Sequence, residues 1–88
     1  SRIERASASA EPEDFDLAAL VRACGEGYRE LLAPRLLDVR VPAQPVPFHG
    51  APDLIVQALD KLVDNARSFC PPEGEIRIEL GGGVQGPR

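Results

Sequence analysis

The sequence predicts a small α/β domain that contains two amphipathic helices and three short strands. Three observations support this class. Apolar residues recur at helical spacing in two segments, they alternate with charged residues in two others, and proline and glycine separate these segments. The 88 residues allow one small domain, with 43% hydrophobic and 27% charged residues as in ordinary globular proteins. With three Phe, one Tyr and no Trp, its core must consist mainly of aliphatic side chains.

Charge and composition exclude several classes of protein. The net charge of -4 argues against a nucleic-acid-binding domain, which would carry a basic patch. No apolar run approaches the ~20 residues that span a bilayer, and no secretory signal pattern occurs. Because the chain begins at Ser1 rather than Met, we expect it to be a part excised from a longer protein. Cys24 and Cys70 lack a CxxC spacing, which favours two buried or half-buried thiols over a disulfide or metal pair.

The first predicted helix follows a polar N-terminal stretch. Residues 1–10 are typical of the frayed end of a polar helix, and Pro12 in the acidic run 11–14 indicates a linker or helix exit. Asp16 is a good N-cap for a helix that starts at Leu17 and ends before Pro34. Its apolar positions are Leu17, Leu20, Val21, Cys24, Tyr28, Leu31 and Leu32. Gly25 and Gly27 weaken this helix by roughly 1 kcal/mol each relative to Ala.

Two strands are predicted next. Residues 36–41 alternate apolar and charged side chains, as in a strand with one buried face. Three prolines then limit residues 46–48 to a short edge strand, because proline cannot donate to a strand ladder. His49 and Gly50 close this segment, and we expect His49 to be a surface residue without a ligand.

A second amphipathic helix is predicted over residues 53–70. On a wheel of about 100° per residue, its apolar side chains fall within an arc of roughly 180°. Asn65 lies inside this arc near its edge, and Lys61, one turn earlier, lies on the same boundary. Either the Asn65 amide bonds to neighbouring backbone, or it is an oxygen donor for a hard cation such as Mg²⁺ in a cleft. Periodicity leaves both alternatives open.

The last predicted strand covers residues 74–80, where three apolar side chains alternate with Glu75, Arg77 and Glu79. A turn at residues 71–74 precedes it, and the glycine-rich residues 81–88 indicate a flexible tail or a long loop. These glycines do not form a phosphate-binding motif, because no helix follows them.

The segment 59–66, Leu-Asp-Lys-Leu-Val-Asp-Asn-Ala, with Phe69, Gly74 and the strand that follows, resembles the N-box region of sensor histidine kinases. That family's box is Asn-Leu-x-x-Asn-Ala, followed by an apolar, a basic and an aromatic residue. The order of the predicted elements is also similar, so the resemblance covers residues 15–80. It implies an incomplete Bergerat ATPase fold of the type shared with gyrase and Hsp90, a two-layer sandwich with helices on one face of a mixed or antiparallel sheet.

The resemblance implies roles for three residues. Asn65 would coordinate the Mg²⁺ bound to the ATP phosphates, and Phe69 holds the aromatic position, where it would flank the adenine or, more simply, pack in the core. Lys61 replaces the first Asn of the box, and it would contact a phosphate as a point charge or be solvated. Ser68 stands where the family has its basic residue, with Arg67 one position early, so the usual phosphate contact is in doubt.

Other parts of a kinase do not occur in the chain. The family's Asp-x-Gly-x-Gly box, its later glycine-rich box and the phosphoacceptor His motif are missing, and catalytic residues are not assigned. We therefore expect the 88 residues alone to be inactive, as a cytoplasmic part of a kinase anchored in the bacterial inner membrane. The parent's partners would be ATP, its dimerisation and phosphoacceptor domain, and a response regulator. The alternatives are a non-catalytic interaction module and another ATP-binding regulator of the same fold, such as an anti-sigma-factor kinase.

Under this hypothesis residues 1–14 end a dimerisation helix and form a linker, residues 15–80 form the partial ATP-binding domain, and residues 81–88 form the tail. Without later strands, the sheet would expose an edge and part of its apolar face. We therefore expect homo-oligomers that form through the strand at residues 75–80.

Overall fold

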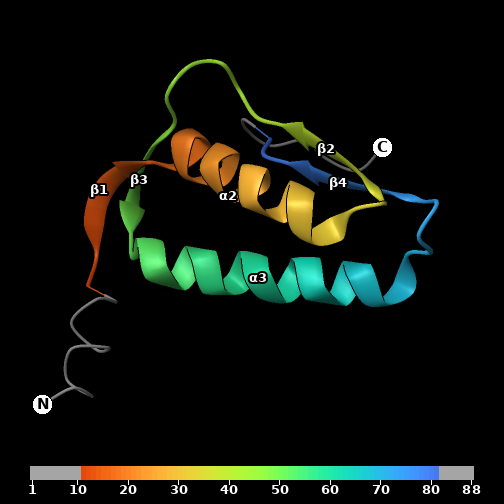
Figure 1. The fold of residues 1–88 in the computed structure, drawn as a ribbon. Coiled ribbons are helices and arrows are strands. Elements are labelled where there is room, and N and C mark those ends of the chain that lie inside the picture. The colour runs from red at the N-terminus through yellow and green to blue at the C-terminus, as the bar shows by residue number, and fades with distance from the viewer. Residues whose placement is uncertain (1–10, 82–88) are drawn as a thin grey trace, which may run out of the picture.

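The computed structural model of the protein describes residues 11–81, which form two helices and four strands (Figure 1). The elements are β1 (Glu13–Asp16), α2 (Leu17–Leu32), β2 (Leu36–Arg40), β3 (Pro47–Gly50), α3 (Pro52–Phe69) and β4 (Glu75–Glu79). The class predicted from sequence is therefore confirmed as a small α+β protein. Within residues 11–81, neither helix has the length and apolar character needed to cross a membrane. Residues 1–10 and 82–88, with the predicted helix end and most of the tail, lie outside the described range.

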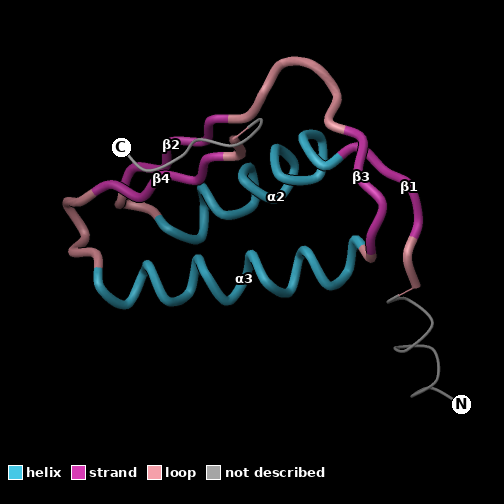
Figure 2. Tube along the Cα trace, turned by 180° about the vertical axis from the view of Figure 1, so that it is seen from behind, coloured by secondary structure: helices cyan, strands magenta, loops and turns pink. Residues whose placement is uncertain are grey.

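The strands form two separate two-stranded sheets rather than the single sheet that was expected. Strand β1 pairs with β3 in antiparallel orientation, and β2 pairs with β4 in parallel orientation (Figure 2). The parallel pair is possible because the long connection from β2 to β4 includes α3, as a parallel crossover requires. Both helices supply core residues to the same face of the β2–β4 sheet, so the expected two-layer arrangement of helices on one face is present there.

Strand β1 corrects the interpretation of the acidic segment as a linker or helix exit. Glu13 and Asp14 belong to this strand and pair with Gly50 and His49 of β3. Phe15 stands opposite Phe48, with the ring centroids 5.7 Å apart in an edge-on arrangement. This contact between residues distant in sequence stabilises a strand that local propensity does not favour.

Strand β3 also differs from the prediction, since it covers residues 47–50 rather than 46–48. His49 is thus a strand residue and not the end of a turn, and its Nδ1 lies 2.7 Å from the Asp14 Oδ1 of the neighbouring strand. Its side chain is 68% exposed, so the expectation that His49 is a surface residue is confirmed.

Helix α2 begins and ends where the sequence predicts. Asp16 is its N-cap, with Oδ1 accepting hydrogen bonds from the backbone amides of Ala18 at 3.0 Å and Ala19 at 3.3 Å. The same oxygen accepts from the Val46 amide at 2.9 Å, which ties the start of the helix to the loop before β3. The Val46 bond, followed by the two helical amides, lowers the pKa of Asp16 below its ordinary value. The helix ends at Leu32, two residues before Pro34.

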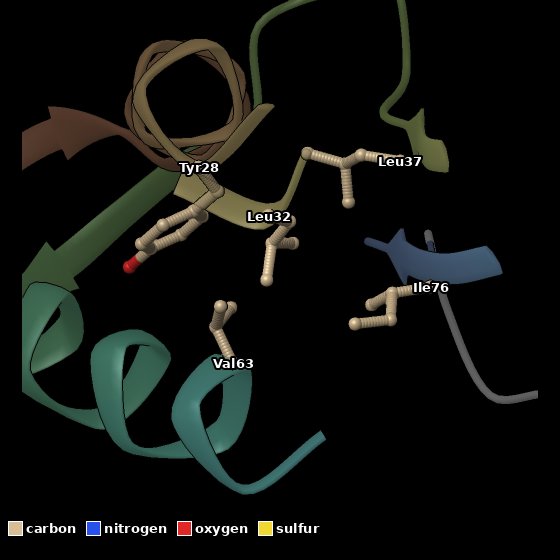
Figure 3. Packing of buried hydrophobic residues seen from close by; sticks show 5 residues of the cluster. All are labelled: Tyr28, Leu32, Leu37, Val63 and Ile76. Carbon is tan, nitrogen blue, oxygen red and sulfur yellow. The ribbon is translucent and has the colours of Figure 1, made fainter. Parts of the chain in front are cut away.

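The core lies where α2, α3 and the β2–β4 sheet meet (Figure 3). Five buried side chains form it, namely Tyr28, Leu32, Leu37, Val63 and Ile76. Cys24 and Cys70 pack at its margin as free, half-buried thiols. The prediction of two thiols rather than a disulfide is therefore confirmed. The core is aliphatic with one tyrosine, as the composition requires.

Candidate functional site

Helix α3 carries the three residues for which the sequence predicts a site. It starts with Pro52 in its first turn, a position where the missing N–H costs nothing, and Asp53 follows in the same turn. It ends at Phe69, where the Cys70 amide donates to the Arg67 carbonyl at 3.3 Å. The bounds differ from the predicted residues 53–70 by one residue at each end, so the location of the helix is confirmed.

The apolar arc of α3 is not buried as a whole. Val63 is its only buried residue, at 3% exposure. By contrast, Leu54 is 51% exposed, Leu62 is 66% exposed and Phe69 is 81% exposed. The arc predicted from periodicity therefore divides into an inner part in the core and an outer part in contact with solvent. We call the outer part, made of Leu54, Ala58, Leu62 and Phe69, the outer apolar face.

The hydrogen bond between Tyr28 and Asp60 shows which way this face points. The Tyr28 hydroxyl donates to Asp60 Oδ1, so the Asp60 side of α3 faces α2. Going round the helix from Asp60, Val63 comes next in the core, and then Leu59, which packs against the core only in part. Leu62 follows about 60° beyond Leu59 at 100° per residue. The outer apolar face thus lies on the side of α3 away from α2, the side of β4.

Lys61, Asn65 and Phe69 form one row along this face. They are spaced by four residues, so their side chains follow one another along the helix surface with a drift of about 40° per step. All three are exposed. The helix therefore presents a cation, an amide and an aromatic ring in sequence on a surface that is otherwise apolar.

The structure corrects one expectation about Phe69. Core packing was the simpler expectation for this ring, but at 81% exposure it contributes nothing to the core. The partly buried residue at the end of the helix is Cys70, which packs against the core cluster instead. Phe69 is the most exposed of the large apolar side chains in the described part of the chain.

Within residues 11–81, the polar contacts of α3 do not involve Lys61, Asn65 or Phe69. Within residues 11–81, the α3 side chains that form polar contacts are Asp60, Asp64, Arg67 and Ser68, and Asn65 is not among them. One of the two alternatives for Asn65 was a hydrogen bond between its amide and neighbouring backbone. Residues 11–81 contain no such bond. The amide is available to an outside partner.

Neither Arg67 nor Ser68 replaces the basic residue of the kinase box. The Ser68 hydroxyl donates to the Asp64 carbonyl at 3.1 Å. Arg67 forms a loose ion pair with Asp64 at 3.6 Å, and it lies about 160° round the helix from Asn65. Lys61 is thus the only cation in this row of α3.

The face is open rather than hollowed. Residues 11–81 enclose no pocket, and they contain no group of three or more His, Cys, Asp or Glu side chains placed to hold a metal ion. One amide oxygen suits Mg²⁺ as a single ligand, since this ion usually keeps several waters and binds through few protein groups together with phosphates. Within residues 11–81, Asn65 therefore does not by itself form a site for a free Mg²⁺ ion.

Sequence patterns did not reveal the polar cluster on the opposite side of α3, where Tyr28 meets Asp60. Burial raises the pKa of the Tyr28 hydroxyl, and the hydrogen bond to the Asp60 carboxylate raises it further. Burial and the nearby Asp60 charge also raise the pKa of the Cys24 thiol. A raised pKa keeps both groups protonated and unreactive, so this cluster joins the helices and is not a second candidate site.

No protein-family model and no curated protein matches the chain.

Proposed function

We propose that the chain is the first half of the ATP-binding domain of a sensor histidine kinase, and that α3 carries the part of the site that meets Mg²⁺ and phosphate. The observation that carries the proposal is the row of Lys61, Asn65 and Phe69 on the exposed side of α3. The Asn65 amide faces solvent between two apolar positions, and no protein group within residues 11–81 bonds to it, so a ligand could reach it.

The fold supports this proposal at a coarse level. The order of a capped helix, a strand, a short strand, the α3 helix and a final strand agrees with the order that the resemblance implies. Both helices cover the same face of the β2–β4 sheet. The open face of α3 is also what half of a nucleotide site presents before its other wall is in place.

Each residue of the row has a role in the proposal. The Asn65 carbonyl oxygen would be the protein ligand of Mg²⁺, and the ion would offset the charge of the nucleotide phosphates. The Lys61 ammonium would attract the same phosphates as a flexible point charge. Phe69 would offer its ring face to the adenine, where stacking supports binding without hydrogen bonds. Autophosphorylation itself would need the remainder of the kinase, since the chain contributes no phosphoacceptor histidine motif.

An NMR titration of the isotopically labelled chain with Mg²⁺ and a non-hydrolysable ATP analogue tests the proposal. We expect shifts concentrated on residues 61–69, and the same titration without Mg²⁺ should give smaller ones. AMP, which lacks the outer phosphates, is the matched ligand control and should leave the Asn65 signals in place. A folded sample without any shifts at millimolar ligand would contradict binding by this half-site.

A second candidate function is a non-catalytic docking module. The absence of a pocket in residues 11–81 and the exposure of Leu54, Leu62 and Phe69 favour it, because a flat apolar surface suits a protein partner better than a nucleotide. The same titration separates the two functions, since a docking module would show no dependence on Mg²⁺ or on the phosphates.

A further inference from the structure

The β2–β4 sheet has an unpaired edge at β4. The Leu36 amide donates to the Gly74 carbonyl at 3.1 Å, and the Leu80 amide donates to the Arg40 carbonyl at 2.9 Å. In a parallel ladder, alternate residues of a strand direct both backbone groups to the same neighbour. Hence backbone N–H and C=O groups point toward β2 at Gly74, Ile76, Ile78 and Leu80. They point toward the other edge of β4 at Glu75, Arg77 and Glu79. Within residues 11–81, no strand pairs with that edge.

The outer apolar face of α3 lies on the same side of the molecule. Val63 of α3 and Ile76 of β4 both lie in the core, and Figure 3 shows β4 on the α3 side of β2. The outer apolar face points away from α2, and a sheet continued beyond β4 would therefore pass beneath it. An added strand would satisfy the open backbone groups and cover part of this face in one step.

From this we infer that a second copy of the chain pairs with β4 in antiparallel orientation, which makes a symmetric dimer with a continuous four-stranded sheet. The two-fold axis is normal to the sheet. Such an axis keeps the helices of both copies on the same face, so the two α3 helices meet above the seam. The inference concerns the 88-residue chain itself and competes with the proposed function, in which later strands of the parent would cover this edge.

The charges on β4 select the register of this pairing. The exposed side chains of the strand alternate as Glu75, Arg77, Glu79. When Ile78 lies opposite Ile78 of the second copy, Arg77 of each chain lies opposite Glu79 of the other, which gives two opposite-charge pairs. Residues whose backbone groups point to the open edge then lie opposite each other, as antiparallel hydrogen bonding requires. Ile76 then meets Leu80 of the second copy on the helix side of the sheet.

The neighbouring registers are worse. A shift that places Arg77 opposite its own copy brings like charges together, and it also sets Glu75 against Glu79. A shift centred on Ile76 keeps two Arg77–Glu75 pairs, but it sets Glu73 against Glu79 twice and places Leu80 opposite Pro72, which lies in the turn before the strand. In the preferred register Glu75 faces Gly81, which carries no charge.

Sedimentation equilibrium of the 88-residue chain over a range of concentrations, without nucleotide or Mg²⁺, tests the dimer. The wild-type chain should pass from its monomer mass of 9.5 kDa to twice that mass as concentration rises. Glu79→Lys should raise the dimer dissociation constant at least about fivefold, because it places two like-charge pairs at the seam. Glu75→Lys makes the same change of net charge on the same strand, and it should leave the constant within about twofold.

A second pair of variants tests the helix contact. Leu62→Glu on the outer apolar face should weaken the dimer about tenfold or more, since it buries a carboxylate at the seam. Leu31→Glu, a change at a Leu of α2 that is 56% exposed, should have no effect. Circular dichroism would verify that each variant is folded. A monomer at all concentrations, or a stronger effect of Glu75→Lys than of Glu79→Lys, would overturn the inference. The nucleotide titration can then be repeated on the monomeric Glu79→Lys chain, which tests the proposed function independently of the dimer.

Discussion

The Tyr28 hydroxyl of α2 donates a hydrogen bond to Asp60 Oδ1 of α3, across 32 positions of sequence. The tyrosine ring is part of the buried core, whereas the Asp60 side of α3 reaches solvent. This bond fixes how α3 is rotated against α2. It therefore also places Asn65 about 140° round the helix from the side that faces α2.

Removal of this bond should destabilise the chain and loosen the rotation of α3. Tyr28→Phe keeps the ring in the core and deletes only the hydroxyl, and we expect a loss of about 1–2 kcal/mol in the free energy of unfolding. Urea denaturation at neutral pH measures this loss. Asp60→Asn retains an acceptor and should cost less, and a larger loss for Asp60→Asn would contradict the assigned donor and acceptor.

The same hydroxyl should make the stability fall at alkaline pH. The folded chain raises the pKa of Tyr28 above its ordinary value of about 10, first by burial and then by the bond to Asp60. Above about pH 10 the unfolded chain loses the phenolic proton while the folded chain keeps it, so the free energy of unfolding drops by up to about 1.4 kcal/mol per pH unit. The stability is complete below pH 10 and is lost as pH rises toward the folded pKa. Tyr28→Phe should remove this component, and an identical slope in the variant would contradict it.

Gly25 and Gly27 form a matched pair for the packing of α2 on β2. A Cβ on Gly25 would lie 2.9 Å from Val39 Cγ2, whereas a Cβ on Gly27 would meet nothing within 4 Å. Gly27→Ala should therefore stabilise the chain by about 0.5–1 kcal/mol through helix propensity alone. Gly25→Ala should destabilise it by about 1–2 kcal/mol, since Val39 is stiff and overpacking outweighs propensity. Thermal melting compares them, and Val39→Ala should rescue Gly25→Ala.

Asp16 should make stability fall at acid pH. The Val46 amide, followed by the amides at the start of α2, lowers the pKa of this carboxylate in the folded chain below its ordinary value. Its contribution is thus present above about pH 4 and is lost as pH falls through the folded pKa. Asp16→Ala should lower the melting temperature at pH 7 and have a smaller effect at pH 2–3. Asp16→Asn keeps an acceptor for the amides, so it should retain more stability with a weaker pH dependence.

Much of the fold follows from local patterns. The cap at Asp16, the end of α2 before Pro34, and the alternation in β2 and β4 each depend on neighbouring residues, and each prediction is confirmed. Strand β1 depends on the contact between Phe15 and Phe48, which no local window contains. Its acidic, proline-containing surroundings favour a linker when considered alone.

The candidate site, like the fold, could be predicted from the sequence only in part. Periodicity correctly places Lys61, Asn65 and Phe69 on one side of α3. It does not reveal which part of the apolar arc is buried, because that depends on the rotation set by Tyr28 and Asp60. The core position expected for Phe69 is wrong for this reason. The assignment of the row to a nucleotide remains a proposal based on the resemblance.

The most direct test of that proposal replaces Mg²⁺ with paramagnetic Mn²⁺ in the presence of the ATP analogue, and maps the loss of NMR signals along the chain. We expect selective broadening around Asn65, abolished by Asn65→Ala and retained in Gln57→Ala, which removes another exposed amide from the same helix. Broadening at the acidic residues of β4 instead, or an unchanged pattern in Asn65→Ala, would contradict the assignment of Asn65 as the metal ligand.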